Sequence, residues 1–599
     1  MLGIVFGADD RLADQLRAAG ARDTVTVPDL DGLAKVATAA DEPILVCADD
    51  LVAHTAALRH LATSPAGPTV ALVLPEPPAS SGAGVREERG RLVPGAPTAT
   101  FGGALRVGVE DLQILAAAAR GAADLDALPA AILSTGTPVF AHRVRLLVAA
   151  RAPDAADRAA AEAAVAAVDS EAAELRLAVK ERDDFFATYF VSTWSPWLTR
   201  WAARLGLGPS AVTAISVAVT VAAAGLFALG GRPALVAGAV LLYLGFALDC
   251  VDGQVARYTR NFSAFGGWLD TMADRAKEYL VYAGLALGAV RADLGDGWAL
   301  AIAALTLQTV RHKTDAWYGA LHDEAAARST ATTGRLGSLS NRVQADQGSV
   351  AYWLKRTVVF PIGERWALMA LAAALFDQRV ALLAVLVWGG LAAAYTLVLR
   401  TIRARAMRVP VLATVNTTRY RDDGLPARFL GRRFVPPLAA VVAALGAAAL
   451  VVAPETLDRG LVVPIAVALV LVAGLPAAAP HEGALDWLVP AALRAVEFLF
   501  VIAVGAAFDV PAAVVYGLLT ALALHHYDLT ARLEKRLGAP PSQWLSLGWD
   551  GRMLVLAIGA ALGAAEVTAG VLAGYLLAVL LSDSTRTWAL PHRTRDQPG

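Results

Sequence analysis

The sequence predicts a protein of mixed class, with a soluble α/β domain at the N-terminus followed by an all-α polytopic membrane region. Of its 599 residues, 56% are hydrophobic and only 18% are charged, and the mean hydropathy is +0.52, which is unlike the composition of soluble proteins. The long apolar runs begin only after about residue 200. This uneven distribution favours a soluble domain joined to membrane helices.

Residues 1–150 are expected to form the α/β domain. Strand-like runs at 2–6, 24–27, 44–47 and 70–74 alternate with helical stretches such as 11–19. The opening MLGIVFGADD has no basic residues and only a short apolar run, so no signal peptide is expected and the N-terminus is expected in the cytoplasm. Residues 151–191, rich in Ala, Glu and Arg over 152–182, are predicted to form a connecting helix.

The segment 185–204 combines aromatic side chains with Arg200 and Arg204. Its aromatic residues are Phe185, Phe186, Tyr189, Phe190, Trp194, Trp197 and Trp201. This mixture predicts a helix in the lipid headgroup region. An ordinary core helix with exposed arginines is the alternative.

Six apolar runs within residues 192–406 predict six membrane spans. They cover 211–229, 233–248, 266–290, 298–310, 366–376 and 380–399. Basic residues gather in the loops at 257–260, 311–356 and 400–408, so the positive-inside rule places these loops in the cytoplasm. Residues 407–599 carry about six further apolar segments, at 434–453, 461–478, 487–508, 511–526, 553–565 and 567–581, and are expected to form a C-terminal membrane domain.

Charge and cysteine content exclude several function classes. With 52 basic and 53 acidic residues, the chain shows no electrostatic footprint of a nucleic-acid binder. Its two cysteines, Cys47 and Cys250, cannot form a disulfide framework or a cysteine-rich zinc site. Six lysines against 46 arginines, together with abundant alanine, suggest a GC-rich bacterial genome.

Four aspartates lie where the second predicted span ends and the third begins. Asp249 and Asp252 share one arc of a helix, and Asp270 and Asp274 share an arc of the next. Acids at the ends of apolar helices are costly, and converging carboxylates need compensating cations. Because no Cys or His accompanies them on those faces, a hard divalent ion, Mg²⁺ or Mn²⁺, is favoured over zinc. Helix caps and buried ion pairs are the alternative.

Small residues on the same faces leave room for a ligand against the backbone. The complete pattern, D-x2-D-G-x2-A-R-x8-G-x3-D-x3-D, runs from Asp249 to Asp274 and includes Gly253, Ala256, Arg257 and Gly266. It resembles the signature of the CDP-alcohol phosphotransferase family at every specified position. The six spans over 192–406 are also similar to the membrane core of that family.

The resemblance implies a reaction and a site. Asp249, Asp252 and Asp270 would hold two divalent ions against the pyrophosphate of a CDP-alcohol. Asp274 would be a further ligand and the general base that deprotonates a hydroxyl acceptor, with release of CMP. Implied contacts to the donor come from Gly253, Ala256, Arg257, Ser263 and Gly266. The family also implies a homodimer, and the GPSAVT segment (208–213) resembles its first-span entry, with Ser210 in place of the usual Asn.

The sequence identifies donor and acceptor less closely. CDP-diacylglycerol is the expected donor and a soluble CDP-polyol the alternative. An inositol or glycerol phosphate is the acceptor suggested by the resemblance. Candidate ligands for an acceptor phosphate, or for headgroups of membrane lipids, are Lys277, Arg311, Lys313, Arg356 and Arg365. A scaffold or transporter that has lost activity is the alternative from another class.

The N-terminal domain resembles a nucleotidyltransferase in one feature. A strand followed by CADD (47–50) is similar to the metal-binding turn of such domains. GADDRLADQLR stands in place of the Gly-rich phosphate loop, so a triphosphate would lack backbone donors. A degenerate, non-catalytic relative is favoured over an unrelated regulatory domain or an active transferase.

Several polar residues of the C-terminal region are not explained by this reaction. The DGLPAR segment starting at Asp423 echoes part of the signature and is expected to be a solvated loop, because Pro426 disrupts a helix. Arg494 and Glu497 are spaced to form either a structural ion pair or a functional pair. The segment 525–528, with two adjacent histidines, is expected to be a cluster at the membrane interface. The whole region loosely resembles membrane extensions of some bacterial family members.

Overall fold

The computed structural model describes residues 1–599 except 8–9, 76–82, 89, 182, 324–348, 407–419, 431–435, 478–482, 535–537, 539 and 589–599. The chain divides into two compact units. Unit 1 comprises residues 1–181, 196–208 and 253–262, and unit 2 comprises residues 182–195, 209–252 and 263–599. The N-terminal α/β region and the mostly helical remainder agree with the predicted fold class.

Unit 1 is built on an eight-stranded mixed sheet. Its strand order is β2-β1-β3-β8-β5-β9-β7-β6. The strands are β1 (Leu2–Phe6), β2 (Asp23–Val27), β3 (Ile44–Ala48), β5 (Val70–Leu74), β6 (Gly84–Glu88), β7 (Arg91–Val93), β8 (Ala99–Val107) and β9 (Phe140–Arg143). β1 pairs in parallel with β2 and β3, whereas β8 is antiparallel to both β3 and β5. A short antiparallel pair, β4 (Leu51–Ala53) with β10 (Ala149–Arg151), forms a second sheet.

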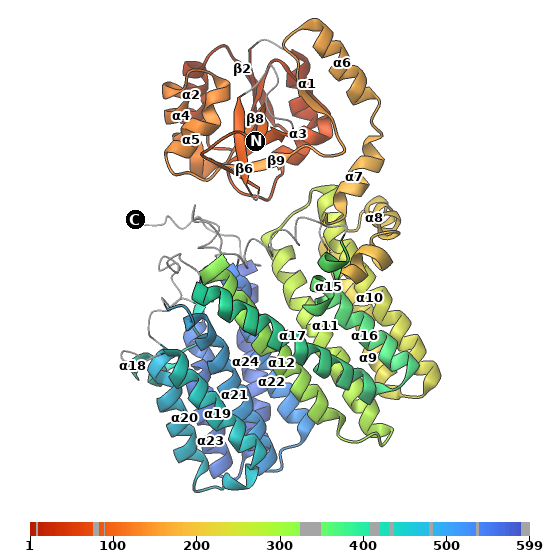
Figure 1. Ribbon diagram of the computed structural model, residues 1–599, viewed down its shortest axis with the longest axis vertical. Coiled ribbons are helices and arrows are strands. Elements are labelled where there is room, and N and C mark those ends of the chain that lie inside the picture. The colour runs from red at the N-terminus through yellow and green to blue at the C-terminus, as the bar shows by residue number, and fades with distance from the viewer. Residues whose placement is uncertain are drawn as a thin grey trace. The chain divides into compact units, whose positions relative to one another are not determined.

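Helices cover both faces of the sheet (Figure 1). On one face pack α2 (Leu30–Ala39), α4 (Leu112–Gly121) and α5 (Leu128–Ser134), and on the other pack α1 (Asp10–Ala18) and α3 (Thr55–Ala62). Since both faces are covered, the central strand β3 is buried at all five positions, which explains its continuous apolar run, ILVCA. The strands predicted from sequence are confirmed in place and length to within one residue.

The connection between the sheet domain and the membrane helices is not one helix. It contains α6 (Ala155–Ala166) and α7 (Ser170–Ala178), followed by a π-helical turn at Ala187–Val191 and α8 (Ser195–Arg204). Asp169 ends the continuity, because its side chain accepts a hydrogen bond from Ala172 N and caps α7. On α8, Trp197 and Trp201 are 70% and 51% exposed, as expected for rings at a membrane interface.

Helices follow at all six predicted apolar runs. They are α9 (Pro209–Leu229), α10 (Arg232–Thr259), α11 (Ala264–Arg291), α12 (Gly297–Tyr318), α15 (Val350–Val358) with α16 (Ile362–Leu375), and α17 (Gln378–Ala406). The fifth is broken, because the chain bends by 69° between α15 and α16. The bend passes through Phe360, whose φ of +56° is left-handed.

The C-terminal region forms a bundle of further apolar helices. They are α19 (Pro436–Val452), α20 (Val462–Ala477), α21 (Val489–Ala507), α22 (Ala512–Glu534), α23 (Gly548–Ala561) and α24 (Ala565–Trp588), preceded by the short α18 (Leu425–Leu430). α12 and α11 pack against α22, and α12 also packs against α21. The bundle is therefore continuous with the preceding spans, in one hydrophobic core.

By length and composition, five helices of the described residues can cross a membrane, or six if α15 and α16 count as one. α11 and α12 are also long, at 28 and 22 residues, but they carry charged side chains. The chain is a multi-pass membrane protein.

Candidate active site

Three of the four predicted acids converge between α10 and α11. Asp249 lies on α10, and Asp270 and Asp274 lie one turn apart on α11. Each offers a carboxylate oxygen, and these oxygens lie within 4.8 Å of one another. The geometry follows from local sequence, because a short turn joins two helices whose acids lie on facing sides.

Asp252, one turn after Asp249, makes a different contact. Its carboxylate accepts a 2.6 Å hydrogen bond from the Thr213 hydroxyl on α9, and it is buried. The sequence prediction missed Thr213 and its neighbour Ser216. A signal was present, since Thr213, Ser216 and Thr220 form a buried polar stripe at helical spacing in an otherwise apolar helix.

Lys277 lies inside this acidic cluster. Its ammonium group is fully buried, forms an ion pair with Asp249, and lies 3.3 Å from Asp274 Oδ1 and 3.2 Å from Ser216 Oγ. The sequence suggested Lys277 as an acceptor ligand. In the structure its contacts are to the acids, so its direct role is to compensate their charge.

The donor set fits a hard divalent ion. Three carboxylates from two helices can reach one small volume, and Asp274 Oδ1 is buried without a hydrogen bond among the described residues. Oxygen ligands of this kind are those that Mg²⁺ and Mn²⁺ prefer. A single ammonium group against these carboxylates leaves negative charge that a divalent cation would neutralise.

The residues implied in donor binding lie around the same turn. Gly253 and Ala256 follow Asp252 on α10, and the Arg257 Nε donates to the Ala178 carbonyl. Ser263 is the N-cap of α11, where its hydroxyl accepts a 2.9 Å hydrogen bond from Gly266 N. A Cβ at residue 266 would lie 2.8 Å from that hydroxyl oxygen, so a larger residue there would displace the capping hydroxyl.

The remaining acceptor candidates differ in how many of their donor groups already have a partner. Arg365 is buried and pairs with Glu278, one turn beyond Asp274, at 3.0 Å. Arg356 donates to the Tyr352 hydroxyl at 2.9 Å. Arg311 is buried and donates to the Val359 carbonyl, but its Nε and Nη1 have no hydrogen-bond partner in the described part of the chain.

Comparison with known proteins accounts for this constellation. Residues 207–335, which contain the acidic cluster, match the family model described as CDP-alcohol phosphatidyltransferase. The chain carries a CDP-alcohol phosphatidyltransferase domain. This bears out the resemblance inferred from the spacing of the aspartates.

One curated relative matches a shorter stretch of the chain. The chain is 38% identical over 86 residues to an archaetidylinositol phosphate synthase of Pyrococcus horikoshii. The match covers 14% of this chain and 44% of the relative, so the chain spans less than half of that relative's length. A second family model, described as a family of unknown function (DUF5941), matches residues 421–596.

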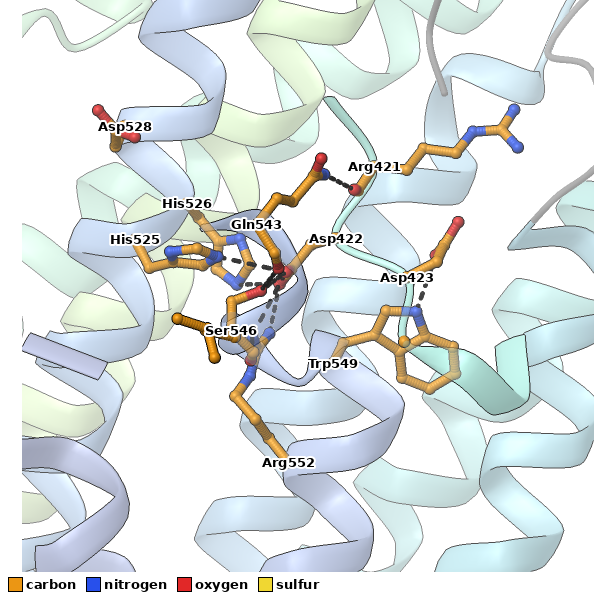
Figure 2. A network of polar contacts seen from close by, with 12 residues as sticks. Arg421, Asp422, Asp423, His525, His526, Asp528, Gln543, Ser546, Trp549 and Arg552 are labelled. Atoms are coloured by element: carbon orange, nitrogen blue, oxygen red, sulfur yellow. Dashed lines mark hydrogen bonds and ion pairs between the residues drawn. The ribbon is translucent and has the colours of Figure 1, made fainter. Parts of the chain in front are cut away.

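The structure corrects the expectation for the DGLPAR segment. Asp422 and Asp423 are buried, at 6% and 7% exposure, and do not lie in a solvated loop. Figure 2 shows Asp422 at the centre of a polar network that includes His525, Ser546 and Arg552. Their partners come from helices far along the chain, so local composition could not reveal the burial.

The histidine segment also belongs to this network. His525 and His526 are buried in the bundle, and His525 Nε2 lies 3.2 Å from Asp422 Oδ1. Arg494 and Glu497 form the structural ion pair that spacing allowed. Arg552 joins them through a 2.7 Å bond from its Nε to Glu497 Oε1. We name the set Asp422, Arg494, Glu497, His525 and Arg552 the C-terminal ion network.

In unit 1, one of the two acids of the CADD turn is paired. Asp50 accepts a 2.7 Å hydrogen bond from Arg151, which also binds Asp126 at 2.7 Å.

Arg260, in the turn before α11, donates to the Thr63 hydroxyl at 2.8 Å and to the His60 carbonyl at 3.1 Å. Burial, and then the charge of Arg260, lowers the pKa of His60 to about 3.

Proposed function

We propose that this membrane protein transfers a phosphoalkyl group from a CDP-alcohol to a hydroxyl acceptor, with release of CMP. The observation that carries the proposal is the convergence of Asp249, Asp270 and Asp274 inside a matched CDP-alcohol phosphatidyltransferase domain. Complete retention of the signature acids argues against an inactive scaffold.

The acids divide into two roles in this proposal. Asp249, Asp252 and Asp270 would hold a pair of Mg²⁺ or Mn²⁺ ions, which would supply electrostatic stabilisation of the charge on the phosphoryl oxygens. Asp274 takes the proton from the acceptor hydroxyl. Its Oδ1 makes no hydrogen bond among the described residues, and its ion pair is with the Lys277 ammonium, 3.3 Å away.

Two cationic side chains assist the reaction without taking or giving a proton. Lys277 holds Asp249 and Asp274 close together, since its ammonium group contacts both. Arg257 contacts a donor phosphate, beside the small residues Gly253 and Ala256 that leave clearance for the cytidine nucleotide. Ser263 and Gly266 shape the capped turn that faces the donor.

The donor is proposed to be CDP-diacylglycerol, because the site lies at the ends of membrane helices. The name of the relative, archaetidylinositol phosphate synthase, favours a polyol phosphate as acceptor. Arg311 is the favoured acceptor ligand, because two of its donor nitrogens have no hydrogen-bond partner among the residues that the structure describes. Lys277, Arg356 and Arg365 have partners already and are weaker candidates.

Placement in the cell follows from charge. The basic loops on the side of the active site favour a cytoplasmic orientation in a bacterial cell membrane. We further propose a homodimer, and a non-catalytic nucleotidyltransferase relative as the N-terminal domain. The pairing of Asp50 with Arg151 supports the latter, because a paired acid is a poor metal ligand.

The direct test is release of CMP by membranes that contain the full chain. Membranes supplied with Mg²⁺, CDP-diacylglycerol and an inositol phosphate should release CMP, and mass spectrometry should detect the phosphatidyl product. Asp274→Asn should lower the rate by about 10²- to 10⁴-fold, the usual contribution of a general base. Asp509→Asn, an exposed acid in the α21–α22 turn, is the matched control.

The outcomes separate the alternatives. Product formed only from a soluble CDP-polyol would replace the lipid donor and keep the reaction class. No CMP from any donor in the panel, or unchanged release by Asp274→Asn, would end the catalytic proposal.

A further inference from the structure

An apolar cavity of about 690 Å³ lies between α12 and α21, with further walls from α19 and α22. All of these elements belong to unit 2. Neither the phosphotransferase signature nor the C-terminal ion network contributes to its lining. Cavities of this size with apolar walls are typical of ligand sites.

The cavity is elongated along the helices. Its lining on α12 recurs every three or four residues, at Asp296, Ala299, Ala303, Thr306 and Val310. At 1.5 Å per residue this stripe is about 21 Å long. On α21 a similar stripe runs through Ala495, Leu499, Ile502 and Ala506, over about 16 Å. The cavity is thus a groove between two helices.

The groove has almost no polar chemistry to offer. Asp296, at one end, uses its carboxylate to cap α12, accepting a 3.0 Å hydrogen bond from Ala299 N. Most of the other lining side chains are aliphatic, and small ones at Ala303 and Ala506 leave those positions exposed. A ligand held by charge or by a hydrogen-bond array does not fit such a lining.

The surroundings of the groove identify its occupant. α21 belongs to a helix that is long and apolar enough to span a membrane, so in a bilayer its side of the groove would face hydrocarbon. There the groove would be in contact with lipid acyl chains and not with water. Each leaflet contributes about 15 Å of hydrocarbon, half of the bilayer core. A groove of about 21 Å therefore accepts one extended lipid tail along its length.

We propose that this groove binds one acyl chain of a membrane phospholipid, between the phosphotransferase domain and the C-terminal bundle. The driving force is close packing. Apolar association within a bilayer gains little from water release and depends on van der Waals contact, so an unfilled groove of this volume is unfavourable. The bound chain completes the interface between α12 and α21.

The test uses the full chain in vesicles of phosphatidylcholine that carries a diazirine near the end of one acyl chain. After illumination, mass spectrometry of peptides should show label concentrated in 297–318 and 489–507. Label spread evenly over exposed helices such as α9 and α17 would overturn the proposal. This measurement needs no variant, so it does not depend on the folding of a mutant.

A substitution that fills part of the groove gives a second test of the proposal. Ala303→Trp should lower labelling of α21 about tenfold, because the indole ring occupies space that the small side chain leaves in the groove. Ala222→Trp, on an exposed face of α9, should leave it unchanged. If Ala303→Trp instead abolishes self-association and leaves lipid labelling intact, a second copy of the chain covers the groove and the proposal is wrong.

Discussion

Replacing Lys277 by Met tests whether this lysine and divalent ions share the same carboxylates. The ammonium group is fully buried, contacts Asp249, and lies 3.3 Å from Asp274. With an effective dielectric constant of about 20, one such pair at 3.3 Å is worth about 5 kcal/mol before desolvation is subtracted. Removing one partner of a buried pair typically costs about 3 to 5 kcal/mol, because the other charge is left uncompensated.

The expected loss of stability depends on metal. In EDTA, the thermal midpoint of Lys277→Met in detergent should fall well below that of the unaltered protein. In excess Mg²⁺ most of this difference should disappear, because the ion compensates the same acids and binds the more negative site more tightly. Lys277→Arg, which keeps the charge, is the control. An equal fall with and without Mg²⁺ would refute the shared-carboxylate argument.

Three further predictions concern other parts of the chain. Trp268 Nε1 donates a 2.7 Å hydrogen bond to Asp528 of α22, so Asp528→Asn and Trp268→Phe should each slow CMP release, and their effects should not add in the double variant. Asp422→Asn should lower the thermal midpoint because it removes one of the two carboxylates that Arg552 contacts, and breaking a buried ion pair typically costs about 3 to 5 kcal/mol. A midpoint equal to that of the unaltered protein would show that the network is not stabilising. Because the pKa of His60 is depressed, its imidazole takes up a proton near pH 6.5 in the unfolded chain but only near pH 3 in the folded chain, so the stability of the fold is complete above pH 6.5 and is lost as the pH falls toward 3. Hydrogen-exchange protection of α3 should therefore fall between pH 7 and 5. The fall should be smaller in His60→Gln, which lacks the titrating group.

Much of the site could be predicted because it is local. Asp249 and Asp274 are joined by one turn between two helices, so helical periodicity alone places their faces. The apolar runs likewise marked the spans, since chain length across a bilayer is set by its thickness. In unit 1, alternating apolar runs fixed the main strands for the same local reason.

The rest could not be predicted because it depends on partners distant in sequence. Asp422 contacts residues 72, 103 and 130 positions away, and nothing in the surrounding residues signals this. The ion pair of Lys277 with Asp249 depends on how α10 and α11 pack, which the sequence does not show. Lys277 was therefore interpreted as an acceptor ligand. The break at Asp169 is a capping contact that helix propensity does not register.

The two charged clusters also differ in the order in which they can form during synthesis. Every acid of the active site is present once the chain has been made to residue 274, so that pocket can close early, within one helical hairpin. The C-terminal ion network must wait for Arg552. Until then, Arg494 and Glu497 enter the bilayer as a self-neutralised pair three residues apart on α21, which lowers the cost of passing two charges through the translocon. The i,i+3 spacing therefore serves the insertion of the chain as well as its finished structure.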